Sequence, residues 1–147
     1  MRLNSYEVIP ALRNHMERIS ALLVAGDEPY LSLNLADQTR ALYREHGFTE
    51  RDVFEVDGKF DWNLFIGATQ SLSLFSEKKI IELRFNNVPD KKAQTALEHY
   101  FADPLSDLFI LISTPQIRAA QQKAKWLTMI DKAGIVAILY PPKAVSY

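Results

Sequence analysis

Four polar residues stand where an α/β domain could do chemistry. Asp27 and Glu28 follow the apolar run that ends at Ala25, and Ser113 and Thr114 follow a second apolar run. The carboxyl ends of parallel strands share one edge of a sheet, and ligands bind in the crevice at that edge. A small α/β enzyme with a pocket there is therefore one hypothesis. Residues of these types more often cap helices, form turns or face solvent, and we favour that role here.

The sequence offers no support for thiol or metal chemistry. The chain has no cysteine, which excludes disulfides, thiolate metal sites and thiol nucleophiles. The three histidines, His15, His46 and His99, are isolated, and no HExxH or comparable ligand spacing joins them. We expect surface or half-buried helix histidines rather than a metal site assembled in space, and we expect no cofactor.

The loop at Gly26–Leu31 stands where a nucleotide-binding α/β domain would hold phosphate. Such a loop meets a helix N-terminus and needs several glycines and a Lys-Ser/Thr pair. Here it reads GDEPYL, with one glycine, no lysine and two carboxylates, and Pro29 removes an N–H donor. The strand that should end in metal-binding acids runs instead into Asn86-Asn87. Glu82, inside that strand, is expected to pair with a lysine or arginine. These features predict a degenerate nucleotide site.

The segment Gln70–Ser76 (QSLSLFS) places large apolar side chains among serines. Leu72 and Phe75 continue the helical spacing of the preceding residues, so both could belong to the core. Leu74 breaks that spacing, and the serines indicate that the helix ends near Gln70–Ser73. Leu74 and Phe75 would then lie at a loop tip, where both cannot point inward. An exposed apolar pair with a polar rim indicates a partner site, and on the residues alone the core and interface hypotheses stand equal.

Strand and helix patterns alternate along nearly the whole chain. The predicted strands and helices are the elements that position the candidate residues described above. Apolar runs and strict alternation predict strands, whereas apolar residues three to four apart predict helices. The predicted strands are residues 19–25, 52–56, 79–85, 108–112 and 135–140, and the predicted helices are 7–17, 30–46, 62–70, 91–101 and 117–133. Asp61 and Asp90 are expected as N-caps, and Pro10 only in a first turn. The alternation predicts one parallel sheet with helices on both faces.

Length and charge narrow the class of protein further. The 147 residues suit one domain, and the composition is that of a globular protein. A net charge of −1 gives no electrostatic drive toward DNA or an anionic membrane, so we expect DNA contact only indirectly, through an assembly. The apolar runs are far shorter than the roughly 20 residues of a membrane span, and the N-terminus shows no signal peptide. We expect a cytoplasmic protein without a membrane partner. The clustered lysines are expected on solvated helix faces; they are Lys91, Lys92, Lys123 and Lys125.

In their order along the chain, these motifs resemble a known family. The Ala21–Leu31 stretch, the Asp61-Trp62 helix start, Gln70–Phe75 and the Leu108–Ser113 strand are together similar to the N-terminal domain of the delta subunit of bacterial DNA polymerase III. That subunit belongs to the clamp loader of the polymerase holoenzyme. The spacing Gln-x-Leu-x-Leu-Phe is the pattern of clamp-binding peptides. The resemblance covers essentially all of the chain.

The resemblance carries its own expectations. It implies a three-layer, P-loop or AAA+-like α/β domain with a five-stranded parallel sheet, a degenerate nucleotide site and no catalysis. It implies that residues 1–147 are the first domain of a longer subunit, whose two further helical domains join the other loader subunits. It also implies binding and opening of the sliding clamp, the beta subunit. The implied clamp-binding residues are Gln70, Leu72, Leu74 and Phe75.

Another clamp-loader subunit is the alternative within the same assembly. A true loader ATPase is disfavoured by the composition of the Gly26–Pro29 loop. A delta-prime-like subunit is disfavoured because a chain without cysteine has no Ser-Arg-Cys finger.

Overall fold

The computed structural model describes residues 1–26, 28–70 and 78–139. Within them, five strands form one sheet in the order β2-β3-β4-β1-β5, and all neighbouring strands run parallel. The strands are β1 (Ala21–Ala25), β2 (Phe48–Val56), β3 (Lys78–Phe85), β4 (Leu108–Thr114) and β5 (Ile135–Ile138). The helices are α1 (Ser5–His15), α2 (Pro29–Glu45), α3 (Trp62–Gln70), α4 (Lys91–Phe101) and α5 (Lys125–Ala133), with 3₁₀ turns η1 (Met16–Arg18) and η3 (Gln121–Lys123). The predicted order of elements and the parallel five-stranded sheet are confirmed.

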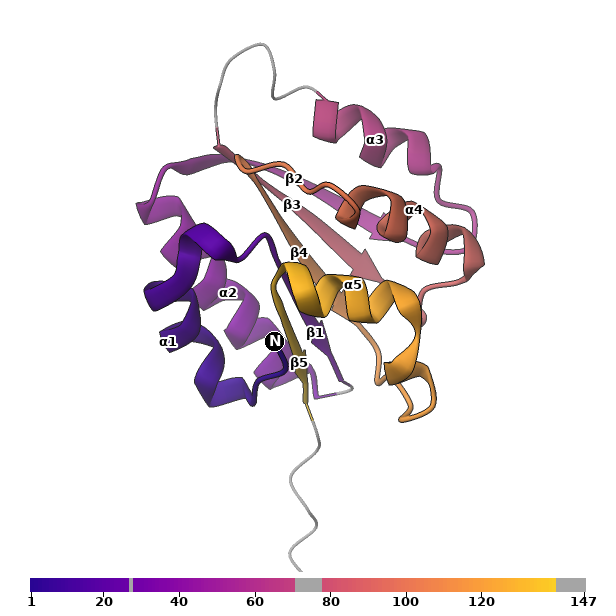
Figure 1. Ribbon diagram of the computed structural model, residues 1–147, viewed down its shortest axis with the longest axis horizontal. Helices are drawn as coiled ribbons and strands as arrows, with labels where there is room; N and C mark the ends of the chain where they lie inside the picture. Colours follow the sequence, from indigo (N-terminus) through magenta and orange to yellow (C-terminus); the bar gives the residue numbers. More distant parts are fainter. Residues whose placement is uncertain (27, 71–77, 140–147) are drawn as a thin grey trace, which may run out of the picture.

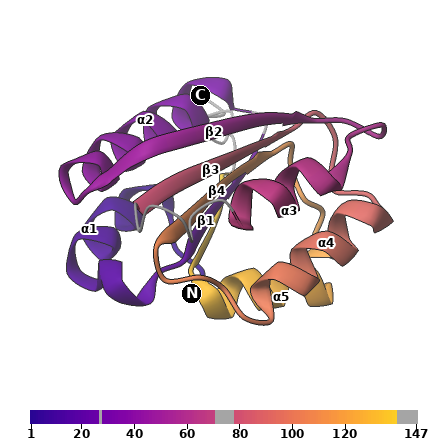
Figure 2. The ribbon, with the colours of Figure 1, turned by 90° about the horizontal axis from the view of Figure 1, so that it is seen from above.

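The sheet lies between two layers of helices (Figures 1 and 2). α1 and α2 cover one face, and α3, α4 and α5 cover the other. From β1 the chain crosses through α2 to the β2 edge, whereas from β4 it crosses through α5 to β5 at the opposite edge. The direction of crossing therefore reverses between the neighbouring strands β1 and β4. In doubly wound folds, ligands bind at the carboxyl ends of such a pair.

The central strands are apolar throughout because helices cover both of their faces. All of β1 is buried, and so are the first five residues of β4. Alternate side chains supply two hydrophobic clusters: Leu23 and Ile81 belong to the cluster under α3, α4 and α5, and Leu22 and Ile80 belong to the cluster under α1 and α2. The alternation predicted for β3 is therefore confirmed, and it decides which side of the sheet each β3 residue faces.

The helix predicted over residues 117–133 is only partly correct. Its first part forms the single 3₁₀ turn η3, and α5 begins at Lys125 because Ala124 is extended. Side chains satisfy the backbone there: the Gln122 amide donates to the carbonyl of Ile117 at 3.0 Å. Ile117 is nevertheless buried in the core, so its apolar spacing reflects burial without a helix.

Three other elements differ from the sequence prediction. Pro10 lies inside α1 rather than in its first turn, so the helix lacks the hydrogen bond that an N–H at this position would donate to the Tyr6 carbonyl. β2 begins at Phe48, four residues before the predicted strand, since pairing with β3 orders residues whose alternation is weak. β5 is shorter than predicted.

Candidate functional site

The residues predicted to bind a partner lie at the limit of the described structure. Gln70 is exposed at the C-terminal end of α3. Leu72, Leu74 and Phe75 lie outside the described residues. The structure therefore describes the two ends from which this segment extends, which are the end of α3 and the start of β3 at Lys78.

α3 is an uncharged helix with apolar side chains on its solvent side. Its sequence, WNLFIGATQ, carries no charged residue, and Asp61 supplies the expected N-terminal cap by accepting a hydrogen bond from the Asn63 amide at 3.0 Å. Phe65 is buried against the sheet, but Leu64 is 54% exposed and Ile66 is 41% exposed. Because they are two positions apart on the helix, Leu64 and Ile66 flank the buried Phe65 on opposite sides, and both leave apolar surface open to solvent.

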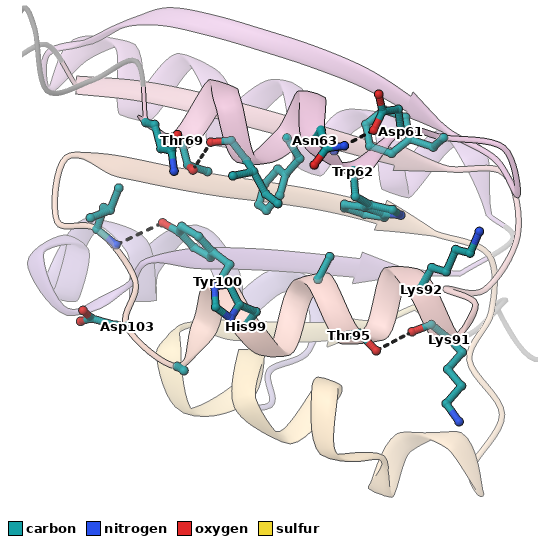
Figure 3. A pocket seen from close by; sticks show the side chains of 17 residues that line it. Asp61, Trp62, Asn63, Thr69, Lys91, Lys92, Thr95, His99, Tyr100 and Asp103 are labelled. Atoms are coloured by element: carbon teal, nitrogen blue, oxygen red, sulfur yellow. Dashed lines mark hydrogen bonds between the residues drawn. The ribbon is translucent and has the colours of Figure 1, made fainter.

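A groove with a volume of about 1110 Å³ separates α3 from α4 (Figure 3). Its apolar wall includes Trp62, Phe65 and Tyr100, whose rings meet edge to face at centroid distances of 5.7 and 5.6 Å. Lys92 and His99 of α4 lie on the polar side. Tyr100 is only 9% exposed, and this burial raises the pKa of its hydroxyl to about 12. Gln70 also lines the groove, so the groove reaches the start of the predicted partner segment.

Lys79 is a buried lysine. From the sequence it was predicted only as part of a strand, and its burial was not predicted. It is 4% exposed, and its Nζ donates to the carbonyl of Ala68 in α3 at 3.1 Å. Asp52 of β2 lies 2.5 Å from the same nitrogen through Oδ2. A lysine is seldom buried unless it is paired. The burial of Lys79 could have been predicted from the alternation in β3. Lys79 stands two residues before Ile81 and four before Leu83, so it shares their side of the sheet, which α3, α4 and α5 cover.

The carboxyl edge of the sheet holds a second, smaller groove of about 470 Å³. Its lining includes Gly26, Ser113 and Thr114, so two of the residues considered for an enzyme site do meet there. Thr114 uses its hydroxyl to donate to the carbonyl of Pro115 at 2.8 Å, which is a turn interaction. The carboxyl ends of β1 and β4 therefore converge where a nucleotide would bind, but the Thr114 hydroxyl is engaged within its own turn.

The N-terminus of α2 is closed to phosphate by the chain itself. Glu28 is its N-cap, and its carboxylate accepts a hydrogen bond from the Tyr30 amide at 3.1 Å. A carboxylate thus occupies the position where the amides of a helix N-terminus would bind phosphate. Gly26 is required by close packing, because a Cβ there would lie 2.8 Å from the carbonyl oxygen of Leu139. Asp27 lies outside the described residues.

Glu82 pairs with arginines, as the sequence analysis predicted. It is 3% exposed; Oε1 accepts from Arg40 of α2 at 2.9 Å, and Oε2 accepts from Arg84 at 2.7 Å. Arg51 of β2 lies 3.3 Å from Oε1. The hydrogen bond to Glu82 raises the pKa of Arg84. One carboxylate therefore joins α2, β2 and β3 on the face that α1 and α2 cover.

The other predicted ionisable residues lie on the surface. His15, His46 and His99 are exposed, and so are Lys91, Lys92, Lys123 and Lys125. Among the described residues, no group of three or more His, Asp or Glu side chains could hold a metal ion. A search of the same residues for a helix long and apolar enough to span a bilayer found none.

Solved structures of other proteins share this fold. The Bacillus subtilis DNA clamp loader delta protein superposes with a TM-score of 0.67 at 16% identity, covering 92% of this chain and 42% of that protein. A DNA polymerase III gamma subunit-related protein from Thermotoga maritima superposes with a TM-score of 0.52 at 16% identity, covering 95% and 47%. At these identities the likeness concerns the fold, and it confirms the predicted AAA+-like class.

Sequence comparison gives the family. The family model for DNA polymerase III, delta subunit, matches residues 22–138. DNA polymerase III subunit delta of Escherichia coli is 25% identical over 125 residues, which is 84% of this chain and 36% of that protein. The Haemophilus influenzae protein of the same name is 23% identical over 110 residues, which is 75% of this chain and 32% of that protein. The chain thus spans about a third of the length of these relatives. Since the family match covers most of its residues, the chain belongs to the DNA polymerase III delta subunit family.

Proposed function

We propose that this chain is a non-catalytic domain that binds the sliding clamp within the DNA polymerase III clamp loader and helps to open it. The observation that carries the proposal is the Gln70-x-Leu72-x-Leu74-Phe75 sequence directly after an uncharged helix with exposed apolar side chains. In the sequence of this delta-family chain, the motif begins at the last residue of α3. Clamp binding uses this segment as an anchor.

The anchor depends mainly on two large apolar side chains. Full burial of Leu74 and Phe75 in an apolar cleft of the clamp is worth about 1.5–3 kcal/mol each, before the cost of ordering the segment. Gln70 adds a hydrogen bond that fixes the register of the segment. Adjacent large side chains of this kind are typical of interface hot spots.

Clamp opening requires more than an anchor. A partner shifts a closed-to-open equilibrium only by as much as it binds the open form more tightly. The described surface that adjoins the anchor is the solvent side of α3, with Leu64 and Ile66 exposed. In this proposal, α3 contacts the clamp where the open ring fits better than the closed ring.

The absence of catalysis is supported by the carboxyl edge of the sheet. Glu28 caps α2 where phosphate would bind, and the Glu82 carboxylate is engaged by arginines. The loader's other subunits and DNA would be contacted through domains that follow this one. The enzyme hypothesis receives no support from Thr114, whose hydroxyl is bonded within its own turn.

The test is a binding measurement with the purified cognate sliding clamp immobilised on a sensor. The wild-type chain should bind, and the double variant Leu74→Ala/Phe75→Ala should lose about a hundredfold or more in affinity. Tyr30→Ala/Leu33→Ala is the matched control, because it removes an exposed apolar pair from α2, where Tyr30 is 84% and Leu33 is 62% exposed. Unchanged binding by the Leu74/Phe75 variant would contradict the proposal, as would a large fall in its Tm, which would place the pair in the core.

A further inference from the structure

One buried side chain connects the two described ends of the partner segment. Lys79, the second residue of β3, donates from Nζ to the carbonyl of Ala68 at 3.1 Å. Ala68 lies two residues before Gln70, the last residue of α3. Nζ also lies 2.5 Å from Oδ2 of Asp52 in β2. The ammonium group therefore links the C-terminal end of α3 to the start of β3, which are the two described ends of the partner segment.

The surroundings of Lys79 suit this role. Its side chain is almost fully buried, and the carboxylate of Asp52 compensates the buried positive charge. A cation at the C-terminal end of a helix also interacts favourably with the helix dipole. Lys78, the preceding residue, is exposed and lies over the ring of Phe48 at 5.5 Å from its centroid, so these adjacent lysines have different partners.

The Lys79 tie adds to the packing that holds α3. The aromatic contacts of the helix come from its first half, where Trp62 and Phe65 pack edge to face with Phe60 and Tyr100. The groove of about 1110 Å³ runs along the helix from Trp62 to Gln70. Thr69 is buried near the end of the helix, but its hydroxyl donates to the helix's own Ile66 carbonyl at 2.6 Å.

We propose that Lys79 is a positioning residue for clamp binding. By fixing the end of α3 against β2 and β3, it holds both ends of the segment at residues 71–77 at one spacing, so that Leu74 and Phe75 can enter the clamp together. This inference rests on the proposed function. Holding the two ends of a binding segment at their bound spacing is a form of pre-organisation, and pre-organisation increases affinity without adding a contact.

A positioning role has a kinetic signature that differs from that of a contact. If only a fraction of molecules holds the ends correctly, the apparent affinity falls by that fraction. The contacts made with the clamp are unchanged, so the loss lies in the association rate. Removing an anchor side chain weakens the bound complex instead, and that loss lies in the dissociation rate.

The experiment measures association and dissociation of the full chain with the immobilised clamp. Lys79→Met keeps the length of the side chain but removes the ammonium group. Lys78→Met is the matched control, since it removes the same charge from the adjacent residue and leaves Ala68 bonded. Asp52→Leu/Lys79→Met removes both charges, so it tests the tie without leaving an unpaired carboxylate if the single variant folds poorly.

We expect Lys79→Met and the double variant to associate about tenfold more slowly, with dissociation unchanged within about twofold. Lys78→Met should behave like the wild type. Equal association rates for Lys79→Met and the wild type would overturn the inference, and so would a loss confined to dissociation or an equal slowing by Lys78→Met. If Leu74→Ala/Phe75→Ala also leaves binding unchanged, the proposed function itself fails; if that variant loses binding, only the role of Lys79 fails.

Discussion

The carboxyl edge of the sheet and the α3 side of the molecule differ in the side chains that they leave without partners within the fold. At the carboxyl edge, Glu28 caps α2 and Glu82 is paired with Arg40 and Arg84, so the polar groups serve the fold. On the α3 side, apolar groups such as Leu64 remain exposed beside an open groove. The buried polar groups of the first region have partners within the fold, whereas the second region leaves apolar side chains open to solvent.

The largest effect on stability should come from the carboxyl-edge network. Glu82→Ala leaves Arg40 and Arg84 without their shared partner, and removal of one member of a buried pair costs about 3 kcal/mol or more. Urea unfolding followed by circular dichroism measures the free energy of unfolding. Glu55→Ala is the control, because Glu55 is exposed and lies 3.6 Å from Arg84, and it should change stability by less than about 1 kcal/mol. Equal effects of the two substitutions would show that the network is not structural.

A smaller effect should appear on the groove side at alkaline pH. Burial raises the pKa of Tyr100 from 10.0 to about 12, so below pH 10 the tyrosine is protonated in both folded and unfolded chains. As pH rises from 10 to 12, only the unfolded chain loses the proton, and stability therefore falls. Tyr100→Phe should make the alkaline decline in Tm shallower.

The control for the alkaline measurement is Tyr30→Phe, since Tyr30 is 84% exposed. This variant should keep the wild-type decline. An alkaline slope that Tyr100→Phe leaves unchanged would mean that the Tyr100 hydroxyl is not buried in the groove wall.

The exposed face of α3 should have almost no effect on folding. Leu64→Ser/Ile66→Ser changes residues that are 54% and 41% exposed, so the free energy of unfolding should change by about 0.5 kcal/mol or less per site. The same variant should bind the clamp several-fold more weakly if this face contacts it. A destabilisation as large as that of Glu82→Ala would show that the face belongs to the core.

The smallest expected effect is that of nucleotide. Because Glu28 fills the phosphate position at the N-terminus of α2, millimolar ATP with Mg²⁺ should leave the Tm unchanged. Thermal unfolding monitored by differential scanning fluorimetry measures this. A rise in Tm of several degrees would contradict the degenerate site and favour a loader ATPase.

Much of the fold could be predicted from the sequence because burial on both faces of a parallel sheet leaves a plain pattern. β4 is a continuous apolar run, and the alternation in β3 assigned Ile81 and Glu82 to opposite faces. The predicted start of the helix at residue 117 was wrong, because Ile117 is buried without being helical. Local periodicity reports burial, and it cannot separate a helix from a turn whose side chains satisfy the backbone.

The candidate site was less accessible to sequence reasoning. The sequence alone predicted that the loop Gly26–Leu31 does not suit phosphate, because the charge and the glycine count of such a loop decide whether phosphate fits. The tie from Lys79 to Ala68 was not, because it joins a strand to a helix through a tertiary contact. The three arginines around Glu82 come from different elements and were likewise beyond local patterns.

The most direct test of the central claim is competition between the chain and its own segment for the clamp. A synthetic peptide of residues 70–76 (QSLSLFS) is titrated into a complex of the fluorescently labelled chain with the cognate sliding clamp, and anisotropy reports release. We predict that the peptide displaces the chain completely, and that a peptide with both positions 74 and 75 changed to alanine does not. A complex that stays intact at saturating wild-type peptide would contradict the claim that this segment is the anchor.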